Sequence, residues 1–314
     1  MTTKLGDGGY VYEELAHWAR LPEGWTFKEV VDVAVDAKDR VYVLNRGEHP
    51  VIVFERDGSF VTAWGEGLFS RPHGMTLTPD ETLYCVDDVS HCIYRCSLSG
   101  QVLQTIGTPG SPAPRHSGRP FDRPTKVALD PKAGDLYIAD GYGNARVHKF
   151  SADGQHLFSW GEHGTDPGQF NLVHSICTDG DGKIYVADRE NHRVQVFDEK
   201  GRYVAQWNNL HRPCGLYIHD GLAYVGQLLT SLSVNADYPN IGACVSIHDL
   251  TGRRLARLGA ARAGEGPGQF TGPHGLAVDS RGDIYVGEVS WNVYGKKLDP
   301  PRAVRCFRKL VKVG

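Results

Sequence analysis

One short plan occurs six times along the chain, and this repetition limits the folds that the sequence can adopt. Each copy has a short strand of alternating apolar residues, a turn rich in Asp, Gly and Lys, and a second strand built around a tyrosine. The copies begin at Val30, Pro72, Pro124, Val173, Pro213 and Pro273. In the first four copies a third strand, a glycine turn and a fourth strand follow. Four antiparallel strands in roughly every 40 to 50 residues are typical of the blades of a β-propeller.

The composition agrees with one globular fold. The 314 residues include 38 glycines, which the repeat places largely in turns, and 40% hydrophobic residues, which can fill a substantial core. Disordered and collagen-like structures are therefore excluded. Length alone favours two domains of about 150 residues each, but six copies of one plan favour a single propeller.

Charge and patterning limit the partners and the compartment that we expect. The formal net charge is −3, with no long run of either sign, so we expect no nucleic-acid partner and no membrane attachment. The N-terminus is polar and no long apolar run occurs, so we expect neither a signal peptide nor a membrane span. Seven cysteines, an odd number, favour reduced thiols and a cytoplasmic location. The sequence indicates no oligomeric state.

The predicted fold is all-β: a single-domain, six-bladed β-propeller over residues 30–314, similar to the NHL-repeat branch of that architecture. The last blade ends in RAVRCFRKL and is short of an outer strand, while GYVYEELAHWA within residues 1–29 has no partner. We expect this N-terminal segment to supply the strand that closes the last blade and protects its edge. Three insertions are expected to be loops that carry specificity, at residues 108–120, 227–242 and 290–301.

Histidine recurs at one position of the repeat. Aligned copies place Val31, His73, Thr125, His174, Cys214 and His274 in one column, at the start of each innermost strand. The histidines belong to blades two, four and six, so a six-fold ring would bring three imidazoles together at its axis. Three neutral imidazoles with an open fourth position suit a catalytic Zn²⁺. Chance placement, or histidines that cap turns, is the alternative, and the regular alternation disfavours it.

Six other histidines share no column of the repeat, and we expect them on the surface or in loops. They are His49, His91, His148, His163, His192 and His211.

A second column follows the second strand of each copy. It contains Arg46, Asp88, Gly141, Arg189, Leu228 and Val289, with Tyr142 directly after Gly141. An arginine at such a position is commonly a solvated or salt-bridged side chain. Beside a three-histidine metal, Arg46 and Arg189 could instead clamp a carboxylate, because a guanidinium group matches its two oxygens. Near such cations the phenolate form of Tyr142 is favoured, which makes it a candidate general base.

Two of the repeats resemble the catalytic core of peptidyl-α-hydroxyglycine α-amidating lyase, a six-bladed propeller zinc enzyme. They read PTKVALDPKAGDLYIADGYGNARVHKF and FNLVHSICTDGDGKIYVADRENHRVQVF, supported by RPHGMTLTPDETLYCVDD and GPHGLAVDSRGDIYVGE. The resemblance implies zinc ligands at His73, His174 and His274. It also implies Tyr142 as the catalytic base, with Arg46 and Arg189 as its partners and as substrate-binding residues.

The resemblance further implies a structural calcium ion. Its ligands would be the backbone carbonyls of Val33 and Met75, together with an aspartate directly after the last histidine ligand. In this chain that residue is Gly275, so the carboxylate that calcium prefers is missing. Met75 is also predicted to bind substrate with the two arginines.

The expected activity is cleavage of the C–N bond of an N-acyl carbinolamide, which gives an amide and an aldehyde such as glyoxylate. The partner is then a small molecule with an α-hydroxy amide and a carboxylate. One alternative is a metal-dependent hydrolase, such as a lactonase or an amidohydrolase, on the same propeller. Another is a non-enzymatic NHL scaffold, which would have no need of three axial histidines.

Overall fold

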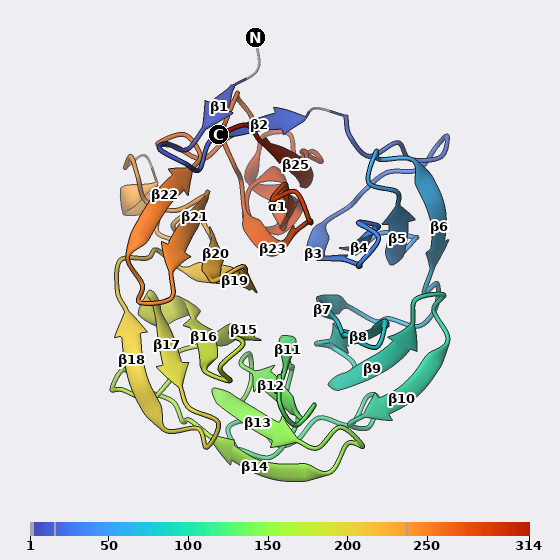
Figure 1. Ribbon diagram of the computed structural model, residues 1–314, viewed down its shortest axis with the longest axis vertical. Helices are drawn as coiled ribbons and strands as arrows, with labels where there is room; N and C mark the ends of the chain where they lie inside the picture. The colour runs from blue at the N-terminus through green and yellow to red at the C-terminus, as the bar shows by residue number, and fades with distance from the viewer. Residues whose placement is uncertain (1–2, 16, 237) are drawn as a thin grey trace. The chain divides into compact units, whose positions relative to one another are not determined.

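Six antiparallel sheets make up most of the protein (Figure 1). The computed structural model describes residues 3–15, 17–236 and 238–314. Five sheets have four strands and one has five, and strands that follow each other in sequence are mostly hydrogen-bonded neighbours. The predicted six-bladed β-propeller is confirmed.

The strands follow the six copies of the repeat. The first blade has β3 Val30–Val35, β4 Val41–Asn45, β5 Val51–Phe54 and β6 Phe60–Trp64. The second has β7 Pro72–Leu77, β8 Thr82–Asp87, β9 Cys92–Ser97 and β10 Val102–Ile106. The third has β11 Lys126–Leu129, β12 Leu136–Asp140, β13 Arg146–Phe150 and β14 His156–Trp160.

The remaining blades follow the same order. The fourth has β15 Val173–Thr178, β16 Ile184–Asp188, β17 Arg193–Phe197 and β18 Tyr203–Trp207. The fifth has β19 Pro213–His219, β20 Leu222–Gln227, β21 Cys244–Asp249 and β22 Arg254–Leu258. The sixth has β23 Pro273–Val278, β24 Ile284–Glu288 and β25 Phe307–Lys312, with β1 Lys4–Leu5 and β2 Tyr12–Leu15 from the N-terminal segment.

Helices are short and lie outside the strands of the repeat. They are η1 Arg189–Asn191, η2 Ser233–Asn235, α1 Ser290–Val293 and η3 Gly295–Lys297. The insertions at residues 227–242 and 290–301 therefore contain helical turns in addition to loop. In the described ranges, none of these helices has the length and apolarity that crossing a membrane requires.

The N-terminal segment completes the sheet of the last blade, as predicted. β2 pairs antiparallel with β25 in the register Tyr12 to Lys312, and β1 pairs with β2. Trp18, just beyond this strand, is 5% exposed and packs against Phe54 of the first blade and Tyr285 and Phe307 of the sixth. All of these residues belong to one of two compact units of the chain, residues 1–66 with 219–314.

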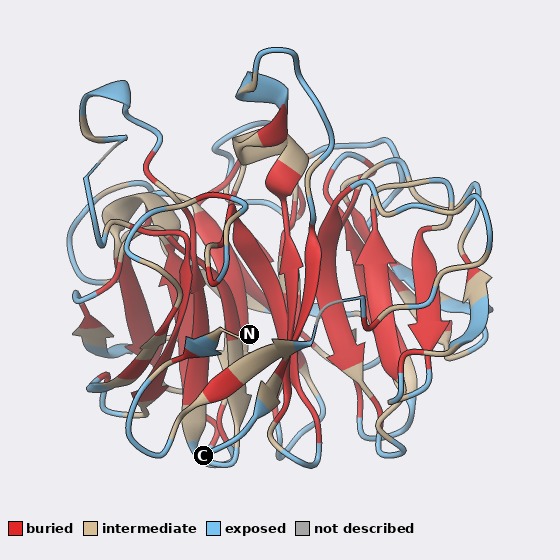
Figure 2. Cartoon of the chain, turned by 90° about the horizontal axis from the view of Figure 1, so that it is seen from above, coloured by how far each residue is buried: buried red, intermediate tan, exposed pale blue. Residues whose placement is uncertain are grey.

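The second compact unit, residues 67–218, contains blades two to four. Its cores are built from the apolar residues of the first three strands of each blade, which Figure 2 shows as buried. The outer strands are more exposed, and β18 buries only Trp207 at its end. His148 lies in β13 of this unit and is fully buried, with Nε2 3.1 Å from Oδ2 of Asp140. The expectation that His148 lies at the surface or in a loop is therefore wrong.

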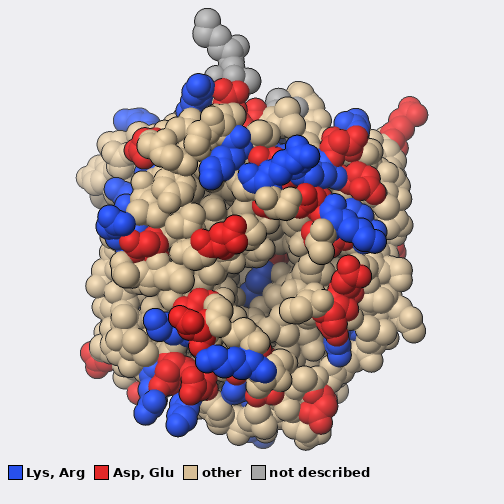
Figure 3. All heavy atoms as spheres, in the orientation of Figure 1, with Lys and Arg blue, Asp and Glu red and all other residues tan. Residues whose placement is uncertain are grey.

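Charged side chains are mixed on the surface. On the face drawn in Figure 3, Lys and Arg are interspersed with Asp and Glu. This distribution agrees with the net charge of −3 and gives no extended field of one sign.

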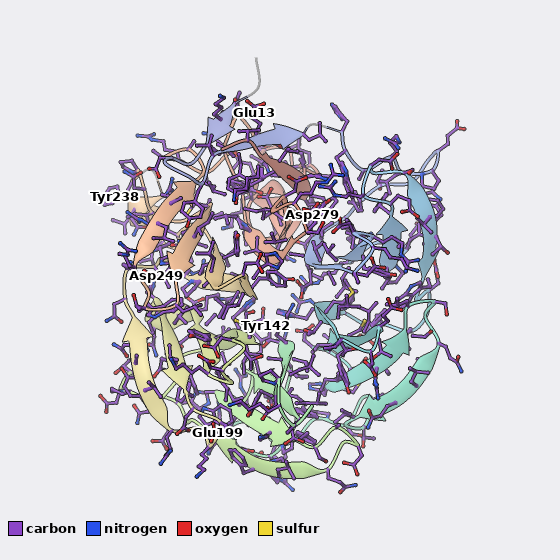
Figure 4. The ribbon with its side chains drawn as sticks, in the orientation of Figure 1. Glu13, Tyr142, Glu199, Tyr238, Asp249 and Asp279 are labelled. Carbon is purple, nitrogen blue, oxygen red and sulfur yellow. The ribbon has the colours of Figure 1, made fainter. Side chains whose placement is uncertain are left out.

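An aspartate fixes the turn between the first and second strands in four of the blades. Its carboxylate accepts backbone N–H groups of the turn and the hydroxyl of a tyrosine on the second strand. The pairs are Asp36 with Tyr42 at 3.3 Å, Asp130 with Tyr137 at 3.0 Å, Asp179 with Tyr185 at 2.9 Å and Asp279, labelled in Figure 4, with Tyr285 at 3.1 Å. All eight residues are buried. The repeated tyrosine of the sequence thus has a hydrogen-bonding role as well as a packing role.

We predict that Tyr185→Phe lowers the free energy of unfolding by about 1–3 kcal/mol, because it leaves a buried carboxylate oxygen of Asp179 short of one donor. Urea denaturation measures the change. Tyr203→Phe is the matched control, since Tyr203 is 39% exposed on the outer strand β18 of the same blade. Equal stability of the two variants would contradict the role of the turn hydrogen bond.

Candidate metal and catalytic site

The three column histidines make the same hydrogen bond. Each histidine is the second residue of the first strand of its blade. Its Nδ1 lies within hydrogen-bonding distance of a backbone carbonyl of a neighbouring blade, which is the next blade in the chain for His73 and His174 and the first blade for His274. The pairs are His73 with Thr125 at 2.9 Å, His174 with Cys214 at 2.9 Å and His274 with Val31 at 2.6 Å. A carbonyl only accepts, so Nδ1 carries the proton and Nε2 keeps its lone pair.

This arrangement fits a metal site. The histidines are 2%, 2% and 7% exposed, in chain order, and together they could hold a metal ion. An imidazole whose Nδ1 is held by a backbone carbonyl presents Nε2 as a ligand in a fixed orientation, which is the usual arrangement around bound metals. The donor set of three neutral imidazoles suits zinc among the common ions.

Tyr142 lies between two of these histidines. Its hydroxyl is 3.0 Å from Nε2 of His73 and 3.2 Å from Nε2 of His174. The residue follows β12, in the loop of the third blade, and Figure 4 labels it. Its hydroxyl is therefore within hydrogen-bonding distance of the two nitrogens that would bind a metal.

The loop DGYGN can hold Tyr142 there because both neighbours are glycines. A Cβ on Gly141 would lie 1.7 Å from the carbonyl oxygen of Val173, and one on Gly143 would lie 2.0 Å from the carboxylate of Asp122. Any larger residue at either position would displace the loop. The two glycines therefore fix where the tyrosine stands.

Two arginines contact the ring of Tyr142. The guanidinium carbon of Arg123 is 4.7 Å from the ring centroid, and that of Arg189 is 5.9 Å away. Arg189 is deeply buried; although burial opposes its charge, Tyr142, Cys214 and Glu190 raise its pKa. Two cations therefore lie close to the ring of Tyr142.

Each of these arginines is held by a carboxylate that it shares with a second arginine. Asp88, fully buried, accepts from Arg123 at 2.6 Å and from Arg71 at 3.1 Å. Glu190 accepts from Arg189 at 2.7 Å and from Arg212 at 2.8 Å. Four guanidinium groups therefore share these two carboxylates, and those of Arg123 and Arg189 contact the ring of Tyr142. The four residues are Arg71, Arg123, Arg189 and Arg212.

The sequence analysis missed three of these arginines. Arg71, Arg123 and Arg212 each precede a proline at the start of the first strand, in blades two, three and five, and this repeated Arg-Pro pair was the available signal. Arg123 and Arg212 have φ values of 64° and 45°, in the left-handed region. Such strained backbone persists where the surroundings hold it, and it is common at functional sites.

Two loop histidines hold that backbone in place. The amide of Arg123 donates to Nδ1 of His91 at 3.1 Å, and the amide of Arg212 donates to Nδ1 of His192 at 3.3 Å. His91 and His192 each lie four residues after the end of the second strand, in blades two and four. The expectation that they share no column is therefore wrong, and both support the backbone of an arginine.

Arg46 belongs to the first compact unit and is anchored there. Its Nη1 lies 3.2 Å from Oε2 of Glu29, and the Glu29 carboxylate also accepts the backbone and side-chain N–H groups of Asn292 at 2.7 and 2.6 Å. Arg46 lines a cavity of about 710 Å³ with Trp25, Phe27 and Trp291 among its walls. The insertion at 290–301 therefore contributes to a cavity that has both aromatic and cationic walls.

The predicted substrate contact Met75 is buried. The residue lies in β7 and its side chain is 1% exposed. Its backbone carbonyl accepts a hydrogen bond from Nζ of Lys126 at 2.6 Å.

Known proteins resemble this chain over most of its length. The NHL repeat model matches residues 121–150, 170–197 and 270–292. NHL repeat-containing protein 3 of Homo sapiens is 35% identical over 298 residues, which cover 87% of this chain and 80% of that protein.

Amidating enzymes match at lower identity. Peptidyl-glycine alpha-amidating monooxygenase B of Xenopus laevis is 28% identical over 88% of this chain and 34% of that protein. Peptidyl-alpha-hydroxyglycine alpha-amidating lyase 1 of Drosophila melanogaster is 29% identical over 72% of this chain and 44% of that protein. This chain therefore spans less than half of each of these enzymes.

Solved structures agree on the fold. Virginiamycin B lyase from Staphylococcus aureus superposes with a TM-score of 0.57 at 14% identity, over 91% of this chain and 96% of that one. A sequence identity of 14% supports a shared fold and no shared function. Taken with the repeats, the human relative shows that the chain belongs to the NHL repeat-containing protein 3 family, and the chain is also homologous to the amidating lyases.

Proposed function

We propose that the protein is a metal-dependent lyase that cleaves the C–N bond of an N-acyl carbinolamide. The observation that carries the proposal is the position of the Tyr142 hydroxyl, 3.0 and 3.2 Å from Nε2 of His73 and His174, with Arg123 and Arg189 on its ring. The homology to amidating lyases supports the same reaction. The reaction converts R–CO–NH–CH(OH)–COO⁻ into R–CO–NH₂ and glyoxylate.

His73, His174 and His274 would hold the metal, and zinc fits their donor set best. The chemistry that a bound Zn²⁺ supplies is Lewis acidity toward the hydroxyl oxygen of the substrate. The chain contributes the fixed imidazole tautomers and the buried setting of the three histidines.

Tyr142 acts as the base. Its phenolate accepts the hydroxyl proton of the substrate, the carbinol C–O becomes a carbonyl, and the C–N bond breaks with its electron pair going to nitrogen. The amide nitrogen takes up one proton. The substrate hydroxyl has released one proton, so the reaction as a whole neither consumes nor releases protons. Arg123 and Arg189 stabilise the phenolate by their positive charge.

Arg46 and Arg189 bind the carboxylate of the substrate in this proposal. A guanidinium group offers two parallel N–H donors to a carboxylate. Both arginines are already ion-paired, to Glu29 and Glu190, which fixes their orientation before substrate arrives. The cavity beside Arg46, with Trp25, Phe27 and Trp291, accommodates an apolar acyl group.

We predict that Tyr142→Phe lowers turnover of N-benzoyl-α-hydroxyglycine by roughly 10²- to 10⁴-fold, because it removes the general base. Glyoxylate release measures turnover, and an unchanged thermal midpoint shows that the fold survives. The matched control is Tyr203→Phe, since Tyr203 is 39% exposed on the outer strand β18. Full turnover by the Tyr142→Phe protein would overturn the assignment.

Metal analysis gives a second prediction. The purified protein should retain about one zinc ion per chain, since three imidazoles form one site, and a chelator should abolish glyoxylate release until zinc is returned. His174→Ala should lose the ion. The control His116→Ala should keep it, because His116 is exposed and its Nδ1 lies 2.6 Å from Nε2 of His163. A protein without metal or turnover would favour the scaffold alternative.

Glu190 positions Arg189, and this role is visible in the pH dependence of stability. Burial opposes the charge of Glu190, but the hydrogen bond from Arg212 and the charge of Arg189 lower its pKa from 4.5 to about 2. A lowered pKa stabilises the fold at all pH values above the ordinary one, and the contribution is lost as the pH falls toward about 2.

We predict that Glu190→Gln destabilises the protein at pH 7 and that the difference from wild type shrinks as the pH falls below the ordinary Glu value of 4.5. Urea midpoints at a series of pH values measure this. Glu199→Gln is the control, since Glu199 is an exposed residue of the same blade (Figure 4). A destabilisation that does not vary with pH would contradict the ion-pair explanation.

A further inference from the structure

We propose that the ammonium group of Lys126 takes the place of the calcium ion that the resemblance to the amidating lyases implies, so that this propeller is stable without calcium. The inference concerns the fold and does not rest on the proposed lyase activity. It starts from the expected ligand Met75 and from Gly275, which stands in the place of the expected aspartate ligand.

The carbonyl of Met75 already binds a cation from the chain. Nζ of Lys126, at the start of β11, donates to this oxygen at 2.6 Å. A calcium ion would need the same oxygen at about 2.3–2.6 Å. The ammonium group and an ion cannot occupy that position together.

Gly74 of the neighbouring strand β7 leaves the space that the side chain of Lys126 occupies. A Cβ on Gly74, next to Met75 in β7, would lie 3.1 Å from Cδ of Lys126, 3.2 Å from its Cα and 2.3 Å from the carbonyl oxygen of Thr125. Only glycine at this position leaves room for the two strands and the lysine stem to approach so closely. The contact of Lys126 with Met75 is therefore part of the packing between the two blades.

Gly275, which belongs to the compact unit of residues 1–66 and 219–314, has no room for an aspartate side chain. A Cβ on Gly275 would lie 2.3 Å from Cα of Asp32, 2.5 Å from its Oδ1 and 2.7 Å from the carbonyl oxygen of Val31. The aspartate that the calcium site needs does not fit there without moving β23 away from β3. The residues present therefore do not fit the implied ion.

The exchange keeps the charge. A calcium ion together with its aspartate has a net charge of +1, and Lys126 together with Gly275 also has +1. One carboxylate, that of Asp32, lies against Gly275. Asp32 is buried, and its Oδ1 accepts the amide N–H of Val33 at 3.0 Å. Because a carboxylate is present, calcium binding has to be tested directly.

The first test uses the unmodified protein. We expect the thermal midpoint to stay the same, within error, in about 10 mM calcium, in about 10 mM magnesium and in excess EGTA, because these ion concentrations exceed the roughly 10⁻⁴–10⁻³ M dissociation constants of weak calcium sites. A midpoint that rises in calcium but not in magnesium, or that falls in EGTA, would overturn the proposal. This measurement needs no variant and no activity.

The second test removes the ammonium group. Lys126→Met keeps the length and apolar character of the stem, and we expect a clear fall in the thermal midpoint. Lys132→Met is the matched control, because Nζ of Lys132 also donates to a backbone carbonyl, that of Asp181 at 2.8 Å, but at an exposed position. Equal midpoints for the two variants would overturn the structural role of Lys126, whatever the lyase assays show.

Discussion

The hydrogen bond from a buried tyrosine to the aspartate of the first turn governs this propeller. It occurs in four blades, at 2.9–3.3 Å, and it fixes the pairing of the first two strands wherever it occurs. Because side chains alternate along a strand, a slip by one residue would turn each apolar face outward. In those four blades a fixed register also gives the residue at the start of the first strand the same position. The positions of His174 and His274, in blades four and six, depend on that regularity.

The histidines in turn connect three pairs of neighbouring blades, namely two with three, four with five, and six with one. Their Nδ1 atoms bind backbone carbonyls of Thr125, Cys214 and Val31, which are residues of the same column. The hydrogen bond that orients an imidazole for a metal is therefore also a contact between blades. Loss of a histidine is therefore expected to weaken the packing between two blades as well as metal binding.

The repeat predicted the fold and the equivalent positions of the three histidines, because both are periodic properties. Strand order, the N-terminal strand in the last blade and the equivalence of the three histidines all follow from aligned copies. Arg123 could not be found in this way. Its contact with Tyr142 depends on a left-handed backbone before Pro124 and on Asp88 of the preceding blade. Alignment of copies compares residues in equivalent places and does not reveal contacts between non-equivalent ones, and the Lys126–Met75 contact was missed for the same reason.

The balance of charge near Tyr142 links these contacts to the proposed reaction. Four guanidinium groups there share two carboxylates, Asp88 and Glu190, although the chain as a whole has a net charge of −3. Arg189 and Arg212 are well buried and share the single carboxylate of Glu190, and such an excess of positive charge is unfavourable until anions arrive. The proposed reaction brings two, the phenolate of Tyr142 and the carboxylate of the substrate. A carbinolamide without a carboxylate would neutralise only part of the excess, so the arginines favour substrates that release an aldehyde acid over those that release a neutral aldehyde.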